Sequence, residues 1–246
     1  MMALKELTWL EVKLFLREPL TAVFVLVLPL VVLYVLNGVF GSQPDPSVWD
    51  GYSPVDFYTS AYVALVLATI GVLSLPVHLA GYREHGVLRR FRASSLRTGT
   101  LVGAHLLVAV IIGAAAALAL TAVSILGYDA TAPQDLVGVL GAFLLVSLAF
   151  ASLGALLGLT LPSARAAQGL GVLLFFVFLM LGGAGPPREV LPSAMLRLSD
   201  LTPLTYAARL LRAPWLGAPW DLTATAVMAG LLLGSAALTS WRLRSP

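Results

Sequence analysis

The chain lacks cysteine altogether and is poor in charge. Without thiols, it forms no disulfide and no thiolate metal site. Only 11% of the 246 residues are charged, whereas 59% are hydrophobic. A soluble domain carries about 25% charged residues, and so few charges cannot cover this much apolar surface in water. The composition therefore predicts an all-α integral membrane protein, whose outer face is solvated by lipid.

The sequence also lacks the motifs of the common catalytic sites. It contains no G-x-x-x-x-G-K-[ST] nucleotide loop, no G-x-S-x-G and no H-E-x-x-H. The three histidines are scattered, and the net charge of +3 is small for a nucleic-acid partner. We therefore expect no catalytic residue, metal site or cofactor in this chain. If the protein does uphill work, the ATP is hydrolysed elsewhere.

Six stretches are apolar over about the 20 residues that a helix needs to cross the hydrocarbon of a bilayer. They are Leu20–Phe40, Phe57–Ala80, Leu101–Leu126, Leu136–Leu161, Gln168–Ala184 and Leu222–Trp241. No linker, repeat or cleavable signal peptide is evident. We predict six transmembrane helices in one domain over residues 1–246, with five spans in 20–184 and the last span and tail in 221–246.

Lysine and arginine are distributed unevenly over the predicted connections, which sets the orientation. One side carries Lys5, Lys13, Arg17, Arg83, Arg89, Arg90, Arg92, Arg97, Arg165, Arg242 and Arg244. The other side carries only Arg188, Arg197, Arg209 and Arg212. Because cytoplasmic loops are enriched in basic residues, both termini are predicted to be cytoplasmic. The abundance of alanine, glycine, leucine and arginine, with little lysine, is typical of a GC-rich bacterial genome and hence of a bacterial plasma membrane.

The third and fourth spans carry small residues at helical spacing, including Ser147, Ala151, Gly154 and Gly158. Small residues allow helix backbones to approach closely in lipid. We expect these positions to pack the subunit itself rather than a contact between subunits.

Residues 1–19 form a predicted amphipathic helix on the membrane surface. Its leucines recur on one face, and Trp9, Lys13 and Arg17 suit the headgroup region. A surface anchor without a protein partner is the alternative.

The connection 81–100 combines an apolar edge at Val87, Leu88 and Phe91 with arginines around it. Such a helix could present Leu88 and Phe91 to a cytosolic protein. The alternative is a topology signal with phospholipid contact.

Residues 185–220 are too long and too apolar for a plain loop. Leu191, Met195 and Leu198 recur at helical spacing, and Thr202 before Pro203 is typical of a helix start. We predict two short outer re-entrant helices, the second ending at Pro214, that cap a cavity. A peripheral amphipathic helix without a role in transport is the alternative.

Polar residues within the spans are few, and no Asp, Glu, Lys or Arg lies in mid-span. This disfavours a proton- or sodium-coupled carrier and a hydrophilic pore. One polar and five aromatic side chains in the second and fifth spans suit a bulky apolar or amphipathic substrate, although packing roles are the simpler interpretation for each. These candidates for a substrate path are Tyr58, Tyr62, Thr69, Phe175, Phe176 and Phe178.

Two motifs resemble those of the type-2 ATP-binding-cassette exporter permeases, especially the antibiotic-resistance (daunorubicin-type) branch. The first lies in the connection 81–100, where the matching residues are Arg83, Glu84, Gly86, Leu88, Arg90, Arg92, Ala93 and Leu96. Ser95 stands where that family usually has proline. The second comprises Leu191-Pro192, then Leu201-Thr202-Pro203-Leu204-Thr205-Tyr206, and Arg212.

The resemblance implies a permease subunit that moves a hydrophobic or amphipathic substrate, such as a drug, secondary metabolite or lipid-like molecule, out of the cell. The connection 81–100 would be a coupling helix seated in a cytosolic ATPase subunit, which would use the ATP and magnesium. The residues implied in coupling are Glu84, Gly86, Leu88, Arg89, Arg90, Phe91 and Arg92. A second permease subunit, identical or different, would complete the path, and Pro192, Pro203 and Tyr206 would form the outer gate.

Other functions stay open on the sequence alone. A polysaccharide exporter permease of the same superfamily shares these features, and so does a membrane scaffold that transports nothing. A membrane-embedded hydrolase is a further possibility, although no nucleophile motif supports it.

Overall fold

The computed structural model describes residues 8–9, 12–13, 23–40, 49, 52–87, 98–186 and 191–244. This part of the chain is helical and contains no strand. In chain order its elements are the π-helix η1 (Val23–Val27), α3 (Leu28–Phe40), α4 (Pro54–Thr69), the π-helix η2 (Ile70–Ser74), α5 (Leu75–Glu84), α7 (Thr98–Tyr128), α8 (Leu136–Thr160), α9 (Ala164–Leu181), α10 (Ser193–Ser199), α11 (Pro203–Trp215) and α12 (Leu222–Arg244).

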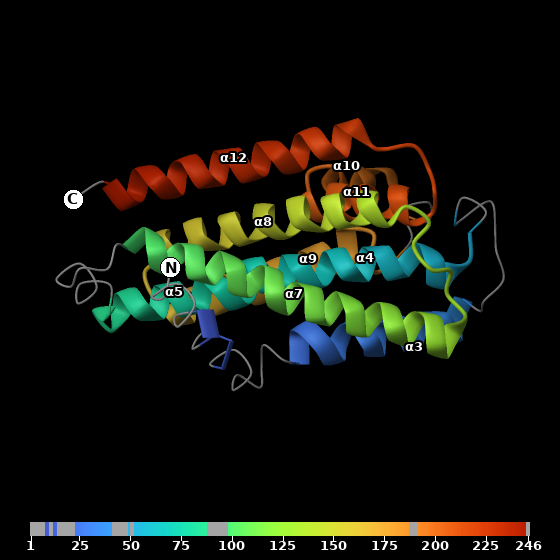
Figure 1. The fold of residues 1–246 in the computed structure, drawn as a ribbon, viewed down its shortest axis with the longest axis horizontal. Coiled ribbons are helices and arrows are strands. Elements are labelled where there is room, and N and C mark those ends of the chain that lie inside the picture. The colour runs from blue at the N-terminus through green and yellow to red at the C-terminus, as the bar shows by residue number, and fades with distance from the viewer. Residues whose placement is uncertain are drawn as a thin grey trace.

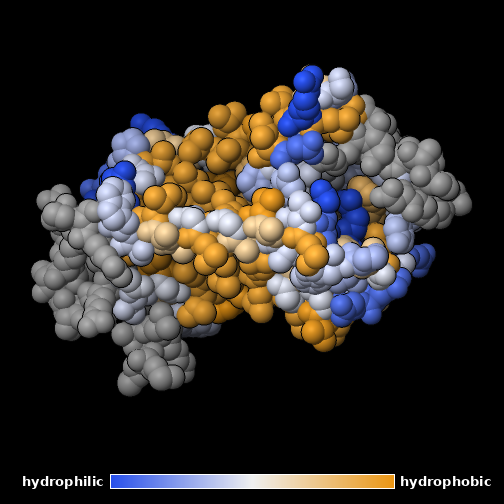
Figure 2. All heavy atoms as spheres, turned by 90° about the horizontal axis from the view of Figure 1, so that it is seen from above, coloured by the Kyte–Doolittle hydropathy of each residue, from blue (hydrophilic) through white to orange (hydrophobic). Residues whose placement is uncertain are grey.

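The long helices lie side by side in an elongated bundle (Figure 1). The end of α5, the start of α7 and the end of α12 lie at one end of it, called here the α5 end. The short helices α10 and α11 lie toward the opposite end, called the α11 end. Figure 2 shows hydrophobic residues over the middle of one face and hydrophilic residues toward both ends. This distribution matches a protein whose middle lies in hydrocarbon.

Five of the described helices are long and apolar enough to cross a membrane. They are Pro54–Glu84, Gly99–Tyr128, Leu136–Thr160, Ala164–Leu181 and Leu222–Leu243. These five confirm the second to sixth predicted spans as membrane-length helices. The first predicted span, Leu20–Phe40, is helical over its described part as η1 and α3. It is not among the five, so the count of six spans stays a prediction.

Helix caps explain why two of the observed spans start earlier than predicted. The second span starts at Pro54 rather than Phe57, because the Ser53 hydroxyl accepts a hydrogen bond from the Asp56 amide and proline suits the first helical turn. The fifth span starts at Ala164 rather than Gln168, because the Ser163 hydroxyl accepts one from the Ala166 amide. Its predicted end among glycines is close to the observed one, since Gly182 caps the helix after Leu181.

The second span is the centre of the subunit. It runs through α4, η2 and α5, and 89% of its apolar window is buried in the protein, more than in any other span. It packs against α3, α7, α8, α9 and α11. A helix surrounded in this way is apolar on every face, which agrees with a sequence pattern that shows no polar stripe in this span.

A proline lies two residues after the end of each π-helix, Pro29 after η1 and Pro76 after η2. Proline has no N–H, and its ring crowds the carbonyl four residues earlier. Before Pro76 the helix widens, and the Leu75 amide donates to the Ile70 carbonyl, five residues back. The wider turn in η2 accommodates the proline without breaking the central span.

Glycines bring α8 and α9 into backbone contact with this wider turn. A Cβ atom added at Gly71 would lie 2.5 Å from the Phe150 carbonyl oxygen of α8. One added at Gly171 of α9 would lie 2.7 Å from the Val72 carbonyl oxygen and 2.8 Å from the Leu73 Cα atom. Gly154 of α8 faces Gly71 in the same way. The small residues of the fourth span therefore pack the subunit itself, as predicted.

Replacing Gly171 by alanine tests this close packing, because the new methyl group would meet backbone that cannot move aside. We expect Gly171→Ala to lower the free energy of unfolding by about 1–3 kcal/mol. Gly169→Ala on the same helix is the control, since a Cβ atom there meets nothing within 4 Å. It should leave stability unchanged or raised by about 0.5–1 kcal/mol. Thermal unfolding of the purified chain in detergent measures both, and equal effects would contradict the packing.

Candidate functional site

The predicted coupling segment begins at the last turn of α5. The His85 amide donates to the Gly81 carbonyl and the Gly86 amide to the Arg83 carbonyl, at 2.9 and 3.1 Å. Gly86 has a φ of 69°, the left-handed conformation that commonly follows a helix end and favours glycine. Gly86 therefore turns the chain out of the central span. The structure assigns this local role to it, and its contact with a partner stays a prediction.

Arg83 and Glu84 fasten the end of α5 to the connection between α8 and α9. The Arg83 guanidinium donates from Nη1 to the Leu161 and Gly158 carbonyl oxygens at 2.8 and 3.2 Å. The Glu84 carboxylate accepts from the Ala164 amide at 3.1 Å. Positive charge thus lies at the C-terminal end of α8 and negative charge at the N-terminal end of α9, as both helix dipoles favour. We call this pair and its three partners the α5 clamp.

Five of the seven predicted coupling residues, Leu88 to Arg92, lie outside the described residues. The same holds for Arg17 of the predicted surface helix. Within the predicted surface helix, the structure describes only residues 8–9 and 12–13, which are helical. The Lys13 ammonium lies 5.1 Å from the centroid of the Trp9 ring. The spacing of four residues allows this cation–π contact on one face of a helix. The roles predicted for these segments stay predictions.

The structure separates the six candidate substrate-path residues into two kinds. Five of them are buried within the subunit, namely Tyr58, Tyr62, Thr69, Phe175 and Phe178. The sixth, Phe176, is 48% exposed. On α9 it follows Leu173 and precedes Met180, which are also exposed, at helical spacing. The exposed stripe of α9, defined by these three residues, is therefore the part of the predicted path that another molecule can reach.

The buried tyrosines hold the interior of the central span. The rings of Tyr58 and Tyr62 stack at 5.6 Å between centroids. The Tyr58 hydroxyl donates to the Gly185 carbonyl at 2.7 Å, which ties the segment after α9 to α4. The Tyr62 hydroxyl is buried without a hydrogen-bond partner among the described residues.

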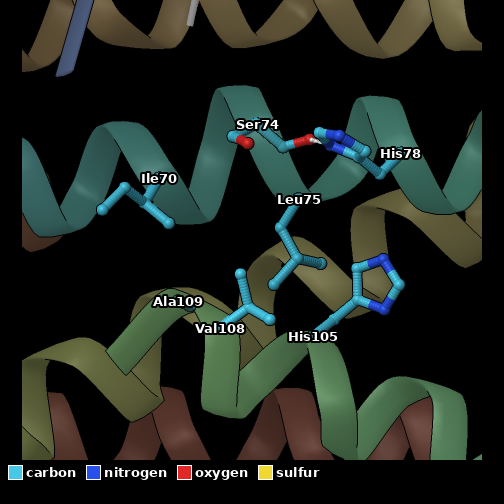
Figure 3. Close-up of a pocket in the computed structure, with 7 residues that line it drawn as sticks. All are labelled: Ile70, Ser74, Leu75, His78, His105, Val108 and Ala109. Atoms are coloured by element: carbon cyan, nitrogen blue, oxygen red, sulfur yellow. Dashed lines mark hydrogen bonds between the residues drawn. The ribbon is translucent and has the colours of Figure 1, made fainter. Parts of the chain in front are cut away.

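A small cavity lies between η2, α5 and α7, and Figure 3 shows His78 and His105 on its two sides. Both Nδ1 atoms lie within 2.9 Å of a backbone carbonyl oxygen, that of Ser74 or Leu101. Because a carbonyl only accepts, a neutral ring making this bond carries its proton on Nδ1. The cavity volume of about 20 Å³ suffices for one water molecule. The cavity is therefore too small to be a substrate site.

The α11 end contains the three residues of the predicted gate. Pro192 precedes the first turn of α10 and Pro203 starts α11, which confirms two short helices in residues 185–220. The Tyr206 hydroxyl donates to the Asp200 carbonyl at 2.8 Å. The second helix was predicted to stop at Pro214, but Pro214 lies in its last turn and the helix ends at Trp215. Whether these helices re-enter the membrane, and the role of the gate, stay predictions.

Sequence reasoning missed a junction at this end. The buried Asp56 carboxylate accepts from the Thr131 amide at 2.6 Å and from the Ser53 hydroxyl at 2.8 Å. The Trp215 indole donates to the Thr131 carbonyl at 3.3 Å. These bonds tie the start of α4 to the connection before α8 and to the end of α11. An aspartate in the first turn of an apolar span was the available signal, but its partner lies 75 residues away.

No group of three or more His, Asp or Glu side chains lies together within the described ranges as a metal site would require. The features that remain for function are the α5 clamp, the exposed stripe of α9 and the α11 end.

Phe175 and Phe176 test the division of the candidate substrate-path residues into buried and exposed side chains. Phe175 is fully buried and its ring lies edge-on to Phe24 at 5.0 Å between centroids. We expect Phe175→Ala to lower the free energy of unfolding by about 3–5 kcal/mol. The neighbouring Phe176→Ala should stay within about 0.5 kcal/mol, as exposed substitutions do. The midpoint of thermal unfolding measures both, and a larger effect at Phe176 would contradict the assignment.

Comparison with known proteins identifies the family. The model of the family described as ABC-2 type transporter matches residues 2–216. A comparison with curated proteins finds no match. The matched region covers nearly the whole chain, including four of the five membrane-length helices and both ends of the bundle. The chain is a multi-pass membrane protein that belongs to the ABC-2 type transporter family, as a permease component without catalytic activity of its own.

Proposed function

We propose that this chain is the transmembrane subunit of an ATP-driven exporter in a bacterial plasma membrane, with a hydrophobic or amphipathic substrate and six spans including Val23–Phe40. The observation that supports it most is the α5 clamp. The segment that would dock on a cytosolic ABC ATPase leaves the membrane directly after two residues that are bonded to α8 and α9. A push on that segment therefore acts on three helices together.

The chemistry of the accessible surfaces supports the substrate class. The exposed stripe of α9 is wholly apolar, with one aromatic ring at Phe176. No ionisable side chain lies between Asp56 and Arg83 of the central span apart from three tyrosines and His78. Moving an ion or a strongly hydrated sugar along such a surface would be costly. In the proposed exporter a second permease subunit faces this stripe, and the path runs between the two.

The orientation follows from the proposed coupling. The α5 end, with both the coupling segment and the end of α12, is then cytoplasmic. The α11 end is on the outer side, where α10 and α11 form the gate as re-entrant helices. The α10 residues Met195 and Leu198 are exposed, as expected if they contact lipid. The daunorubicin-type branch is the part of the family that this proposal favours.

Capture of the partner tests the function directly. The full chain, extracted gently from its native membrane with an affinity tag, should retain a cytosolic subunit that carries a P-loop. Its absence under conditions that keep the chain folded would point to the scaffold alternative. A captured glycan-processing enzyme would favour the polysaccharide exporter.

Charge reversal within the coupling segment tests the mechanism. In the complex with its ATPase, Arg90→Glu and Phe91→Ala should abolish the stimulation of ATP hydrolysis, because the helix would lose its charged and apolar contacts with the partner. Arg242→Glu is the matched control, since it makes the same charge change at the same end of the bundle on the exposed end of α12. ATP turnover in vesicles measures all three. Unchanged stimulation in the first two variants would count against coupling here.

A further inference from the structure

A larger cavity lies between α7 and α8, away from the exposed stripe of α9. Its volume is about 200 Å³. On α7 it extends from Ala114 to Thr121, and on the antiparallel α8 from Leu136 to Phe143. Seven residues of helix span about 10 Å. The cavity is therefore a slot that runs along both helices, in the direction in which they cross the membrane.

The slot offers an occupant almost nothing but hydrocarbon. Residues of α4 and α11 form its floor. Trp215 of α11 lines the slot, and its indole N–H already donates to the Thr131 carbonyl. Thr121 supplies the one hydroxyl among the lining side chains. At the mouth, Leu136 and Leu140 are 62% and 54% exposed. An apolar mouth on a membrane-length helix opens to lipid.

We propose that this slot binds a segment of one acyl chain of a membrane lipid. An apolar cavity of about 150 Å³ already accepts benzene and stays dry, so this one has room for several methylene groups. A chain lying along the membrane normal matches the direction of the slot, whereas a compact polar ligand would find no hydrogen-bond partners. The site exists because Ala114 and Ala117 leave the space empty on the α7 side. Lipid binding here needs neither ATP nor a partner subunit, so it is independent of the proposed function.

Fluorescence of Trp215 tests the proposal, because this side chain is only 3% exposed and lines the slot. The full chain is placed in phosphatidylcholine vesicles whose acyl chains are brominated near their middle, or in unbrominated ones. Bromine quenches an indole that it touches. The contribution of Trp215 is obtained from a variant with Trp9, Trp49, Trp220 and Trp241 changed to Phe. It is obtained independently from the difference between the natural chain and Trp215→Phe.

Trp215 should be quenched by the brominated lipid, and Ala117→Leu, which fills the slot, should weaken that quenching about twofold or more. The control is Ala115→Leu, the same change at an exposed position of α7 outside the slot, and it should leave quenching as it was. If Trp215 in the natural chain were not quenched, the proposal would be overturned. A second copy of the chain covering the mouth of the slot would give that result. Equal quenching in the two variants would also overturn the proposal, because bromine would then reach the indole by another route.

Discussion

The subunit depends on the close approach of one helix backbone to two others. Pro76 widens the central span into a π-turn, and Gly71, Gly154 and Gly171 let α8 and α9 pack directly against that turn. Helices in lipid gain nothing from the hydrophobic effect between them, so contact at this distance is their main source of attraction. This crossing covers the central span on the side of α8 and α9, and α3, α7 and α11 cover the rest.

The α5 clamp extends this packing to the surface. Arg83 and Glu84 bind opposite ends of two helix dipoles, and they are the last two residues of α5, directly before the chain turns out of the central span. In the proposed exporter, a displacement of the coupling segment acts on α8 and α9 through the clamp. At the other end, Asp56, Thr131 and Trp215 join the start of the same span to α11. One continuous helix, Pro54–Glu84, thus connects the α5 end, where coupling is proposed, with the α11 end, where the gate is proposed.

Much of the fold could be predicted from sequence, because membrane-length apolar runs and caps are local signals. Five spans and the two short helices after Pro192 were found in this way, with errors of a few residues where Ser53 and Ser163 cap their helices earlier than expected. The candidate path was less predictable. Nothing local distinguishes Phe175, which is buried, from Phe176, which is exposed. The α5 clamp could not be predicted either, because the partners of Arg83 lie 75 and 78 residues away in the sequence.

The central claim is that the end of α5 and the α8–α9 connection move as one unit. The chain has no cysteine, so His85→Cys with Arg165→Cys introduces the only thiols, each next to a residue of the bonded Glu84–Ala164 pair. These are joined with a short bifunctional thiol reagent in the complex with its ATPase, and ATP-driven transport is measured in vesicles. If the two segments move together, transport continues at the rate of the unlinked variant. Transport that stops on cross-linking and recovers on cleavage of the link would contradict the account.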